Sequence, residues 1–350
     1  MKKQLKVHVY LLCFNEEAII ESVIRYYSSF CSKIFIMDNM STDNSVAIAN
    51  KFSNVTIVPW ESDGIDESLY IHMKSQTYKK YSRQGGIHTS EVADWVISCD
   101  MDEILYHHNI LEALDLYDKK GVTVPQITGF NIAGENEVDC KKPIVEQYSL
   151  AQRAEGFDKR IIFKPEFNIT YHEGCHPRGS GFDCMKNTYG YKTSNEYPLA
   201  LLHYKHIGSR LYVSAKKNYN RMFDNADKIV GRGKESAVGK YYNNIVQKEV
   251  LISPLVRQAI KVFDDEGRVR FNDFNATTGE EGVDLLIENN KFINQEDVNF
   301  VRDLAIGIEK TDLNTALKLM KIALKFRPDG EGMKMKINEY QDRLSKGNVN

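Results

Sequence analysis

The first hundred residues alternate short apolar runs with segments of helical spacing. The apolar runs are rich in β-branched and aromatic residues, as expected for strands. The segments between them carry apolar residues three or four positions apart, as on one face of a helix. Strands and helices that alternate in this way predict a parallel, doubly wound sheet. The expected strands are Val7–Phe14, Lys33–Met37, Val55–Val58 and Trp95–Ser98, and the expected helices are Glu16–Phe30, Asn44–Phe52 and Ser68–Tyr81.

The remaining chain is less regular. Short strands are expected between long, polar, glycine-containing loops, and from Tyr212 onward the pattern is mostly helical. Asp312–Arg343 reads as two helical stretches broken by Pro328-Asp329-Gly330, and it resembles one tetratricopeptide-type helical hairpin. We therefore expect a domain over residues 1–230 and a helical C-terminal region over 231–350, with the hairpin at about 312–343. The short strands are expected at Gly121–Pro125, Arg160–Lys164 and Leu199–Tyr204.

Length, charge and cysteine usage narrow the class of protein. The 350 residues exceed the usual limit of roughly 250–300 for a single core. With 46 Lys and Arg against 48 Asp and Glu, the net charge of −2 argues against a nucleic-acid binder. No apolar run reaches the roughly 18–20 residues that span a bilayer, and Val7–Phe14 lacks the cleavage site of a signal peptide. Six cysteines without metal-ligand spacing predict reduced thiols in a cytoplasmic protein.

Polar residues follow three of the expected strands. They are Asn15-Glu16-Glu17, Asp38-Asn39 and Asp100-Met101-Asp102-Glu103. Ligands of parallel sheets bind beyond the carboxyl ends of the strands, so these residues should share one site. Asp100 and Asp102 are two residues apart and point the same way on an extended chain. Their oxygens suit Mg²⁺ or Mn²⁺, whereas an isolated Asp-x-Asp is as well explained by a solvated turn.

Three segments carry motifs in a fixed order. Leu11–Glu17 reads LLCFNEE, Phe35–Asp43 reads FIMDNMSTD, and Asp94–Glu103 reads DWVISCDMDE. Together they resemble the family 2 branch of GT-A glycosyltransferases, whose members carry KNEE, DNxSTD and DWVxxxDxDE segments. The resemblance covers about residues 5–105, and more weakly extends to about 220. It implies an α/β GT-A fold, with a Rossmann-like, mostly parallel sheet flanked by helices and followed by a C-terminal α-helical region.

The sequence departs from the family pattern in two places. Cys13-Phe14 stands where the branch often has a basic residue before Asn. The DDGSTD of the wider family is here Asp38-Asn-Met-Ser-Thr-Asp43. The identity of the nucleotide base is therefore less secure than the use of a metal.

The resemblance also implies roles for individual residues. Asp38 would accept a hydrogen bond from the base N–H, with Asn39 near the ribose. Asp100 would lie near the ribose and metal-bound water, and Asp102 would bind Mn²⁺ or Mg²⁺, which neutralises the departing diphosphate. A histidine after the last core strand completes the metal site in many GT-A enzymes. The metal ligands expected are thus Asp100, Asp102 and His203 (alternative His206), and the nucleotide-sugar site comprises Cys13, Asn15, Glu17, Asp38, Asn39, Gln76, Asp100 and Met101.

An inverting transfer also needs a carboxylate base for the acceptor hydroxyl. No clean motif marks it. Glu173, between His172 and His176 in a glycine-containing loop, is the leading candidate, and Asp183 and Asp158 are alternatives. Each is equally explained as a surface carboxylate. Basic residues after the last strand are candidates for contact with the diphosphate, an anionic acceptor or a membrane, or form a solvated helix face: Lys205, Arg210, Lys216, Lys217 and Arg221.

These observations predict a metal-dependent, inverting glycosyltransferase. The donor expected is a UDP-sugar, and the acceptor is a glycan or lipid-linked glycan of surface polysaccharide synthesis. We expect a cytoplasmic enzyme, peripheral at the inner face of the membrane, with the C-terminal helices available to a protein partner. Two alternatives remain: a non-catalytic sugar-nucleotide-binding scaffold, and a sugar nucleotidyltransferase. The latter would carry a glycine-rich basic loop where this chain has Asn15-Glu16-Glu17.

Overall fold

The computed structural model describes residues 5–171, 189–224, 233–247, 255–256, 259–275 and 295–347. It comprises two compact units, residues 1–256 with 261–269, and residues 257–260 with 270–350. The boundary expected near residue 230 falls within 225–232, outside the described residues. Of the helices described in these ranges, none combines the length and apolarity needed to cross a membrane.

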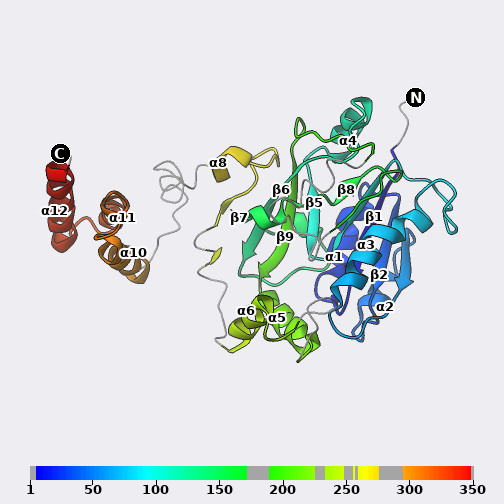
Figure 1. The fold of residues 1–350 in the computed structure, drawn as a ribbon, viewed down its shortest axis with the longest axis horizontal. Coiled ribbons are helices and arrows are strands. Elements are labelled where there is room, and N and C mark those ends of the chain that lie inside the picture. The colour runs from blue at the N-terminus through cyan, green and yellow to red at the C-terminus, as the bar shows by residue number, and fades with distance from the viewer. Residues whose placement is uncertain are drawn as a thin grey trace. The chain divides into compact units, whose positions relative to one another are not determined.

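The first unit begins with a mainly parallel sheet of order β3-β2-β1-β4-β8 (Figure 1). Every residue of the central strand β1 is buried, as expected for a parallel strand covered on both faces. The four strands expected from the alternating pattern are confirmed, and a short antiparallel strand extends the sheet. The strands are β1 (Val7–Cys13), β2 (Lys33–Asp38), β3 (Val55–Pro59), β4 (Trp95–Asp100) and β8 (Ile162–Phe163).

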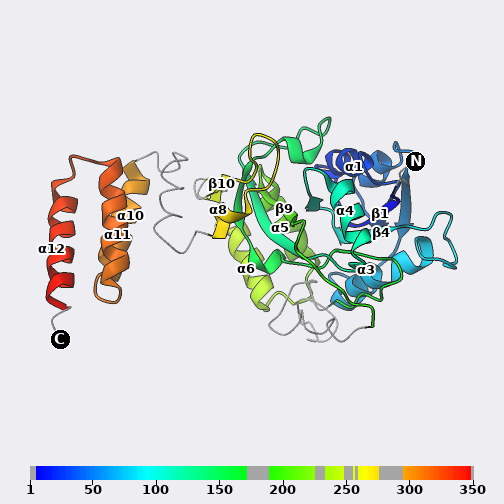
Figure 2. The ribbon, with the colours of Figure 1, turned by 90° about the horizontal axis from the view of Figure 1, so that it is seen from above.

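Helices cover both faces of this sheet. Figure 2 shows α1 (Ile20–Ser28) and α3 (Glu67–Tyr81) on opposite sides of it. The third helix, α2 (Ser45–Ala49), is shorter than the sequence predicts. Helix α3 begins at Asp66, whose carboxylate accepts the N–H groups of the next turn and so fixes the start of the helix. This start determines which α3 side chains face the carboxyl ends of the strands.

A second sheet of order β10-β7-β6-β9-β5 follows β4 along the chain. Strand β5 pairs antiparallel with β9, and in this register Glu103 lies opposite His203. The backbone N–H of Tyr204 also donates to the carbonyl of Asp102, at 2.8 Å. The pairing therefore brings β9 against the acidic end of β4. The strands are β5 (Glu103–Tyr106), β6 (Ile127–Gly134), β7 (Leu150–Arg153), β9 (Leu199–Ile207) and β10 (Ile260–Lys261).

The prediction of a strand at Gly121–Pro125 is wrong. Gly121–Pro125 forms an irregular connection between α4 (Ile110–Lys119) and β6. Gly121 has a φ of 64°, in the left-handed region, which turns the chain at the end of α4. The N–H groups of Thr123 and Val124 then bond the carbonyl of Lys192 without forming a ladder. The apolar residues in this segment are buried, which explains why the sequence imitates a strand.

The rest of the chain is mainly helical, as the sequence predicts. In the first unit, α5 (Arg210–Arg221) packs on α6 (Ala237–Gln247) through a small apolar cluster. The second unit has its own core, centred on Met320 and Tyr340. The two stretches expected at 312–343 are helices separated by residues 327–330. The helices described in the second unit are α8 (Phe271–Asn275), α10 (Gln295–Ile308), α11 (Leu313–Phe326) and α12 (Glu331–Gly347).

Candidate functional site

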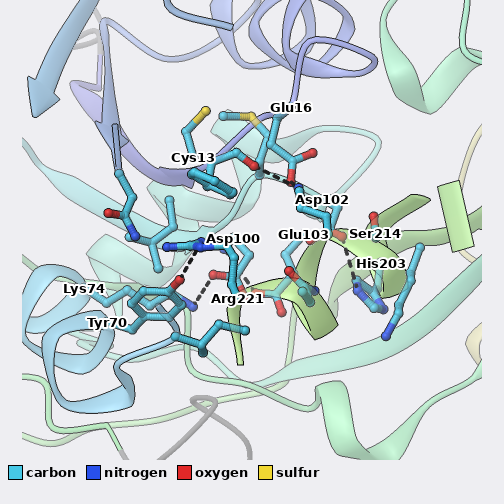
Figure 3. Close-up of a pocket in the computed structure, with 18 of the residues that line it drawn as sticks. Cys13, Glu16, Tyr70, Lys74, Asp100, Asp102, Glu103, His203, Ser214 and Arg221 are labelled. Atoms are coloured by element: carbon cyan, nitrogen blue, oxygen red, sulfur yellow. Dashed lines mark hydrogen bonds and ion pairs between the residues drawn. The ribbon is translucent and has the colours of Figure 1, made fainter. Parts of the chain in front are cut away.

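A cavity of about 240 Å³ lies at the carboxyl ends of β1 and β4. Figure 3 shows side chains from α3, β9 and α5 pointing into it beside those strand ends. The cavity is strongly charged, with acidic and basic groups in close balance. This combination suits a ligand that carries phosphates together with a cation. The acidic residues of the lining are Glu16, Glu67, Asp100, Asp102 and Glu103, and the basic ones are Lys74, Lys159, Lys205, Arg210, Lys217 and Arg221.

Asp102 and His203 face each other across this cavity. Asp102 Oδ2 lies 3.7 Å from His203 Nε2. On the other side of the ring, His203 Nδ1 lies 2.9 Å from the amide oxygen of Asn131, and in this assignment Nδ1 carries the proton. Burial lowers the pKa of His203 to about 3, against the opposing effect of the Asp102 carboxylate. The imidazole is therefore neutral, with the lone pair of Nε2 directed toward Asp102.

This pair fits part of a divalent cation site. Two electron-pair donors that face each other without a proton between them are stabilised by a cation. Neighbouring ligands of an octahedral ion with bonds of about 2.1 Å lie about 3.0 Å apart, so 3.7 Å requires only a small closure. Within the described ranges, no three His, Cys, Asp or Glu side chains converge as a metal cage. Asp102 and His203 would hold Mn²⁺ or Mg²⁺, with the other positions left to phosphate oxygens and water.

Ring packing and a glycine fix the orientation of His203. Its imidazole stacks on Phe157 of the 3₁₀ turn η2 (Glu155–Phe157), with ring centroids 4.1 Å apart. Phe157 in turn lies against Gly129 of β6, where an added Cβ would come within 2.5 Å of Phe157 atoms. The β-sheet thus positions the candidate ligand through Asn131 on one side and Phe157 on the other.

Asp100 is not brought to this pair. Its Oδ1 lies 2.7 Å from the Nζ of Lys74, a side chain only 4% exposed that reaches the cavity from α3. Burial by itself would raise the pKa of Asp100, but the ammonium groups of Lys74 and Lys159 bring it below its ordinary value. Asp100 is therefore ionised, with Lys74 as its partner in the structure.

Lys74 was not predicted from the sequence, whereas Gln76 on the same helix was included in the expected nucleotide-sugar site. Gln76 does not line the cavity, and its Oε1 accepts a hydrogen bond from Lys79 at 2.8 Å. Residues two apart on a helix point roughly 200° away from each other, so only one of Lys74 and Gln76 can face the strand ends. The burial of Tyr78, whose hydroxyl donates to the Phe167 carbonyl, indicates which face turns inward.

A buried ion pair supports the loop between the two aspartates. Lys159 and Glu103 are 1% and 2% exposed and contact each other through Nζ and Oε1. The second oxygen of Glu103 accepts the backbone N–H of Asp100, at 3.4 Å. Burial raises the pKa of Glu103, and Lys159 opposes this shift. The pair therefore holds the backbone that presents Asp100 and Asp102.

Helix α5 presents three cations to the cavity. Arg210, Lys217 and Arg221 are seven and four residues apart, so they share one helix face. Arg210 bridges Glu16 and Asp102, and Lys217 lies 2.7 Å from the other oxygen of Glu16. The guanidinium of Arg221 lies 3.7 Å from the centre of the Phe14 ring, bonded to Tyr70 and to the carbonyl of Gly64. From the sequence alone, these three residues were only candidates for contact with the diphosphate, an anionic acceptor or a membrane.

Some of the other residues predicted for the nucleotide-sugar site line the cavity, and some do not. Cys13, Asn39 and Met101 line the cavity. Asn39 is 3% exposed, and both ends of its amide bond Ser62, at 2.8 and 3.1 Å. Asp38, next to it, is also buried, and its Oδ1 has no hydrogen-bond partner among the described residues. Asp38 does not line the cavity, and this oxygen is enclosed by protein.

Asn15 and Glu17 lie outside the cavity lining and join two strand-end loops. Asn15 has a φ of 51°, and its Oδ1 accepts the N–H of Thr42 at 2.7 Å. Glu17 is exposed and accepts hydrogen bonds from the backbone and side chain of Asn44. Both residues thereby fix the loop that follows Cys13 at the end of β1 and the loop after β2, which carries Asn39.

Two of the three general-base candidates lie outside the residues that the structure describes. Glu173 and Asp183 fall within residues 172–188, which the structure does not describe. Asp158 is described, and its two oxygens are bonded by Arg153 at 2.6 Å and by the Gly129 N–H at 2.8 Å. These bonds give Asp158 a structural role beside β6. The alternative metal ligand His206 does not line the cavity, and burial lowers its pKa to about 4.

Residues 9–176 match the family described as Glycosyl transferase family 2. Among solved structures, residues 1–349 of TarS from S. aureus are 12% identical with a TM-score of 0.38, covering 98% of this chain and 92% of that one. The same protein in complex with UDP-GlcNAc gives a TM-score of 0.39 at the same identity and coverage. Glucosyl-3-phosphoglycerate synthase from Mycobacterium tuberculosis, with Mn²⁺, UDP-glucose and glycerol 3-phosphate, is 22% identical with a TM-score of 0.23, covering 36% and 44%. No curated protein matches this chain.

Proposed function

We propose that this chain, whose residues 9–176 match glycosyltransferase family 2, is a metal-dependent, inverting nucleotide-sugar glycosyltransferase with a UDP-sugar donor. The acceptor we propose is a glycan or lipid-linked glycan of surface polysaccharide synthesis. Such an acceptor would bring a cytoplasmic enzyme to the inner face of the membrane, and the C-terminal helices would serve a protein partner.

One observation carries the metal dependence. Asp102 Oδ2 and the lone pair of His203 Nε2 face each other at 3.7 Å in a cavity lined by cations. A bound divalent ion supplies charge neutralisation of the departing diphosphate. Lys74, Arg210 and Lys217 lie in the same cavity and supply hydrogen-bond donors for phosphate oxygens.

The proposed reaction is a single displacement at the anomeric carbon. The acceptor oxygen forms a bond to that carbon while the bond to the diphosphate oxygen breaks, and the diphosphate leaves with the electron pair. The acceptor proton passes to a carboxylate, for which we propose Glu173. Asp158, the alternative within the described residues, is already bonded by Arg153 and Gly129.

A donor panel tests the proposed activity. The full-length protein, incubated with UDP-, GDP- and TDP-sugars and Mn²⁺, is expected to hydrolyse or transfer sugar from a UDP-sugar alone. EDTA should abolish this turnover, and added Mn²⁺ should restore it. Turnover that persists in EDTA would contradict metal dependence. A preference for a GDP- or TDP-sugar would contradict the proposed uridine nucleotide but would not contradict metal dependence.

Replacing Glu173 with Gln tests the assigned base. The amide keeps the shape of the side chain but cannot take the acceptor proton, so transfer should fall by about 10²–10⁴-fold. Donor affinity, measured by calorimetry with the UDP-sugar, should stay within about twofold because the base acts on the acceptor. Asp183→Asn is the matched control and should retain transfer. If Asp183→Asn loses transfer and Glu173→Gln retains it, Asp183 is the general base instead of Glu173.

A further inference from the structure

Arg210 occupies an unusual position for a cation beside a candidate metal site. Its guanidinium lies 2.7 Å from Glu16 Oε2 and 3.1 Å from Asp102 Oδ2, and the side chain is 9% exposed. The oxygen that Arg210 contacts on Asp102 is the same one that faces His203. Arg210 therefore neutralises the carboxylate oxygen to which a divalent ion would bind.

A cation at Asp102 Oδ2 and the guanidinium in its present position would repel each other. An ion bonded to this oxygen would lie about 2.1 Å away from it. The Nη2 atom of Arg210 lies 3.1 Å from the same oxygen, and both positive charges would sit in a cavity that limits solvent screening. Metal binding and the Arg210–Asp102 contact therefore oppose each other.

Glu16 gives the guanidinium a second anchor. One oxygen of Glu16 contacts Arg210 Nη1, and the other contacts Lys217 Nζ at 2.7 Å. Lys217 also donates to the carbonyl of Phe14, at 2.8 Å. The Glu16 contact can persist when the Asp102 contact breaks. The Nη2 atom released from Asp102 would remain in the cavity, where a diphosphate oxygen is its natural acceptor.

We propose that Arg210 exchanges Asp102 for the donor diphosphate, so that it weakens binding of the metal alone and strengthens binding of metal and nucleotide together. This inference rests on the proposed metal dependence. The exchange makes the two ligands cooperative, because the nucleotide supplies the partner that Arg210 loses when the ion binds. Coupling of this kind is reciprocal, so the metal must raise nucleotide affinity by the same factor.

Calorimetric titration of the full-length protein with Mn²⁺ alone tests the exchange. Arg210→Met should bind Mn²⁺ about tenfold more tightly than the unchanged protein when no nucleotide is present. In the presence of saturating UDP this advantage should disappear, so the coupling factor between Mn²⁺ and UDP should fall by at least the same amount. Simple chelation of Mn²⁺ by UDP cannot produce the first effect, because UDP is absent from that titration.

Two variants serve as controls. Lys216→Met removes one charge from the same helix at an exposed position outside the cavity lining, and its Mn²⁺ affinity should match that of the unchanged protein. Arg210→Lys keeps the charge but has a single nitrogen that cannot bridge two carboxylates, so its Mn²⁺ affinity should be intermediate. This variant also provides the test if Arg210→Met fails to fold by circular dichroism.

The outcomes separate this inference from the metal assignment. Mn²⁺ affinity that is unchanged or weaker in Arg210→Met and in Arg210→Lys, but lost in Asp102→Asn, would overturn the exchange and leave the metal site standing. Mn²⁺ affinity that survives in Asp102→Asn would place the ion elsewhere and overturn both. Tighter Mn²⁺ binding in Lys216→Met equal to that in Arg210→Met would reduce the effect to net charge and overturn the exchange.

Discussion

Replacing Asp102 with Asn is expected to lower kcat/KM for sugar transfer by about 10²–10³-fold, the cost of removing one group that stabilises developing charge. The amide keeps the volume of the side chain but removes the negative charge that faces His203 Nε2 at 3.7 Å. The loss should appear in kcat and in the apparent affinity for Mn²⁺. Steady-state rates measured over a range of Mn²⁺ concentrations, with the best donor of the panel, provide the measurement.

Asp100→Asn is the matched control for this prediction. Asp100 lies two residues away, but its carboxylate contacts Lys74 and does not face His203. Its substitution should leave the Mn²⁺ dependence within about threefold while changing donor KM, as for a residue that acts on binding. An Asp100→Asn variant that loses Mn²⁺ dependence as fully as Asp102→Asn would assign both aspartates to the ion, as the sequence motif alone suggests.

His203→Gln tests the other half of the pair. If Asp102 and His203 hold one ion, the double variant should be little worse than either single variant, because residues that act as a unit show non-additive losses. Losses that multiply would indicate two independent roles and contradict a shared ligand site.

The strand ends of this site could be predicted from the sequence because their signals are local. Strands β1, β2 and β4 are short apolar runs with polar residues at or just beyond their ends: Asn15 after β1, Asp38 at the end of β2 and Asp100 at the end of β4. Parallel pairing then brings those residues to one edge: Cys13 lies opposite Asp38, and Leu12 lies opposite Asp100. His203 was accessible by the same reasoning, since it lies within the apolar strand β9.

The partners of these residues could not be predicted, because they depend on contacts between distant segments. Lys74 meets Asp100 only after α3 has packed on the sheet, so its partner does not follow from the helix pattern. Arg210 meets Asp102 across 108 positions of sequence. Glu103 and Lys159 are 56 positions apart, and each taken alone reads as a surface charge. Such pairs are products of tertiary structure, whereas periodicity reports only local burial.

The buried pair of Lys159 and Glu103 gives the largest expected effect on stability. Lys159→Met should reduce the free energy of unfolding by about 3–5 kcal/mol, since it leaves a carboxylate that is 2% exposed without its counter-ion. By contrast, Lys120→Met removes a cation paired with the exposed Glu196 and should leave the free energy of unfolding nearly unchanged, because solvent screens this pair. Urea denaturation of the two variants beside the unchanged protein measures both effects.

The cost of Lys159→Met should also grow with pH. Burial already raises the pKa of Glu103 above its ordinary value of 4.5, and loss of the opposing ammonium raises it further. The folded variant then retains a proton that the unfolded chain releases, so its stability falls as pH rises from about 4.5 through the raised pKa. The stability gap should therefore be wider at pH 8 than at pH 5. Adding Glu103→Gln removes the buried charge and should recover most of the loss at pH 8. A gap independent of pH, or no recovery in the double variant, would mean that Lys159 stabilises the fold through packing of its alkyl chain instead of through charge.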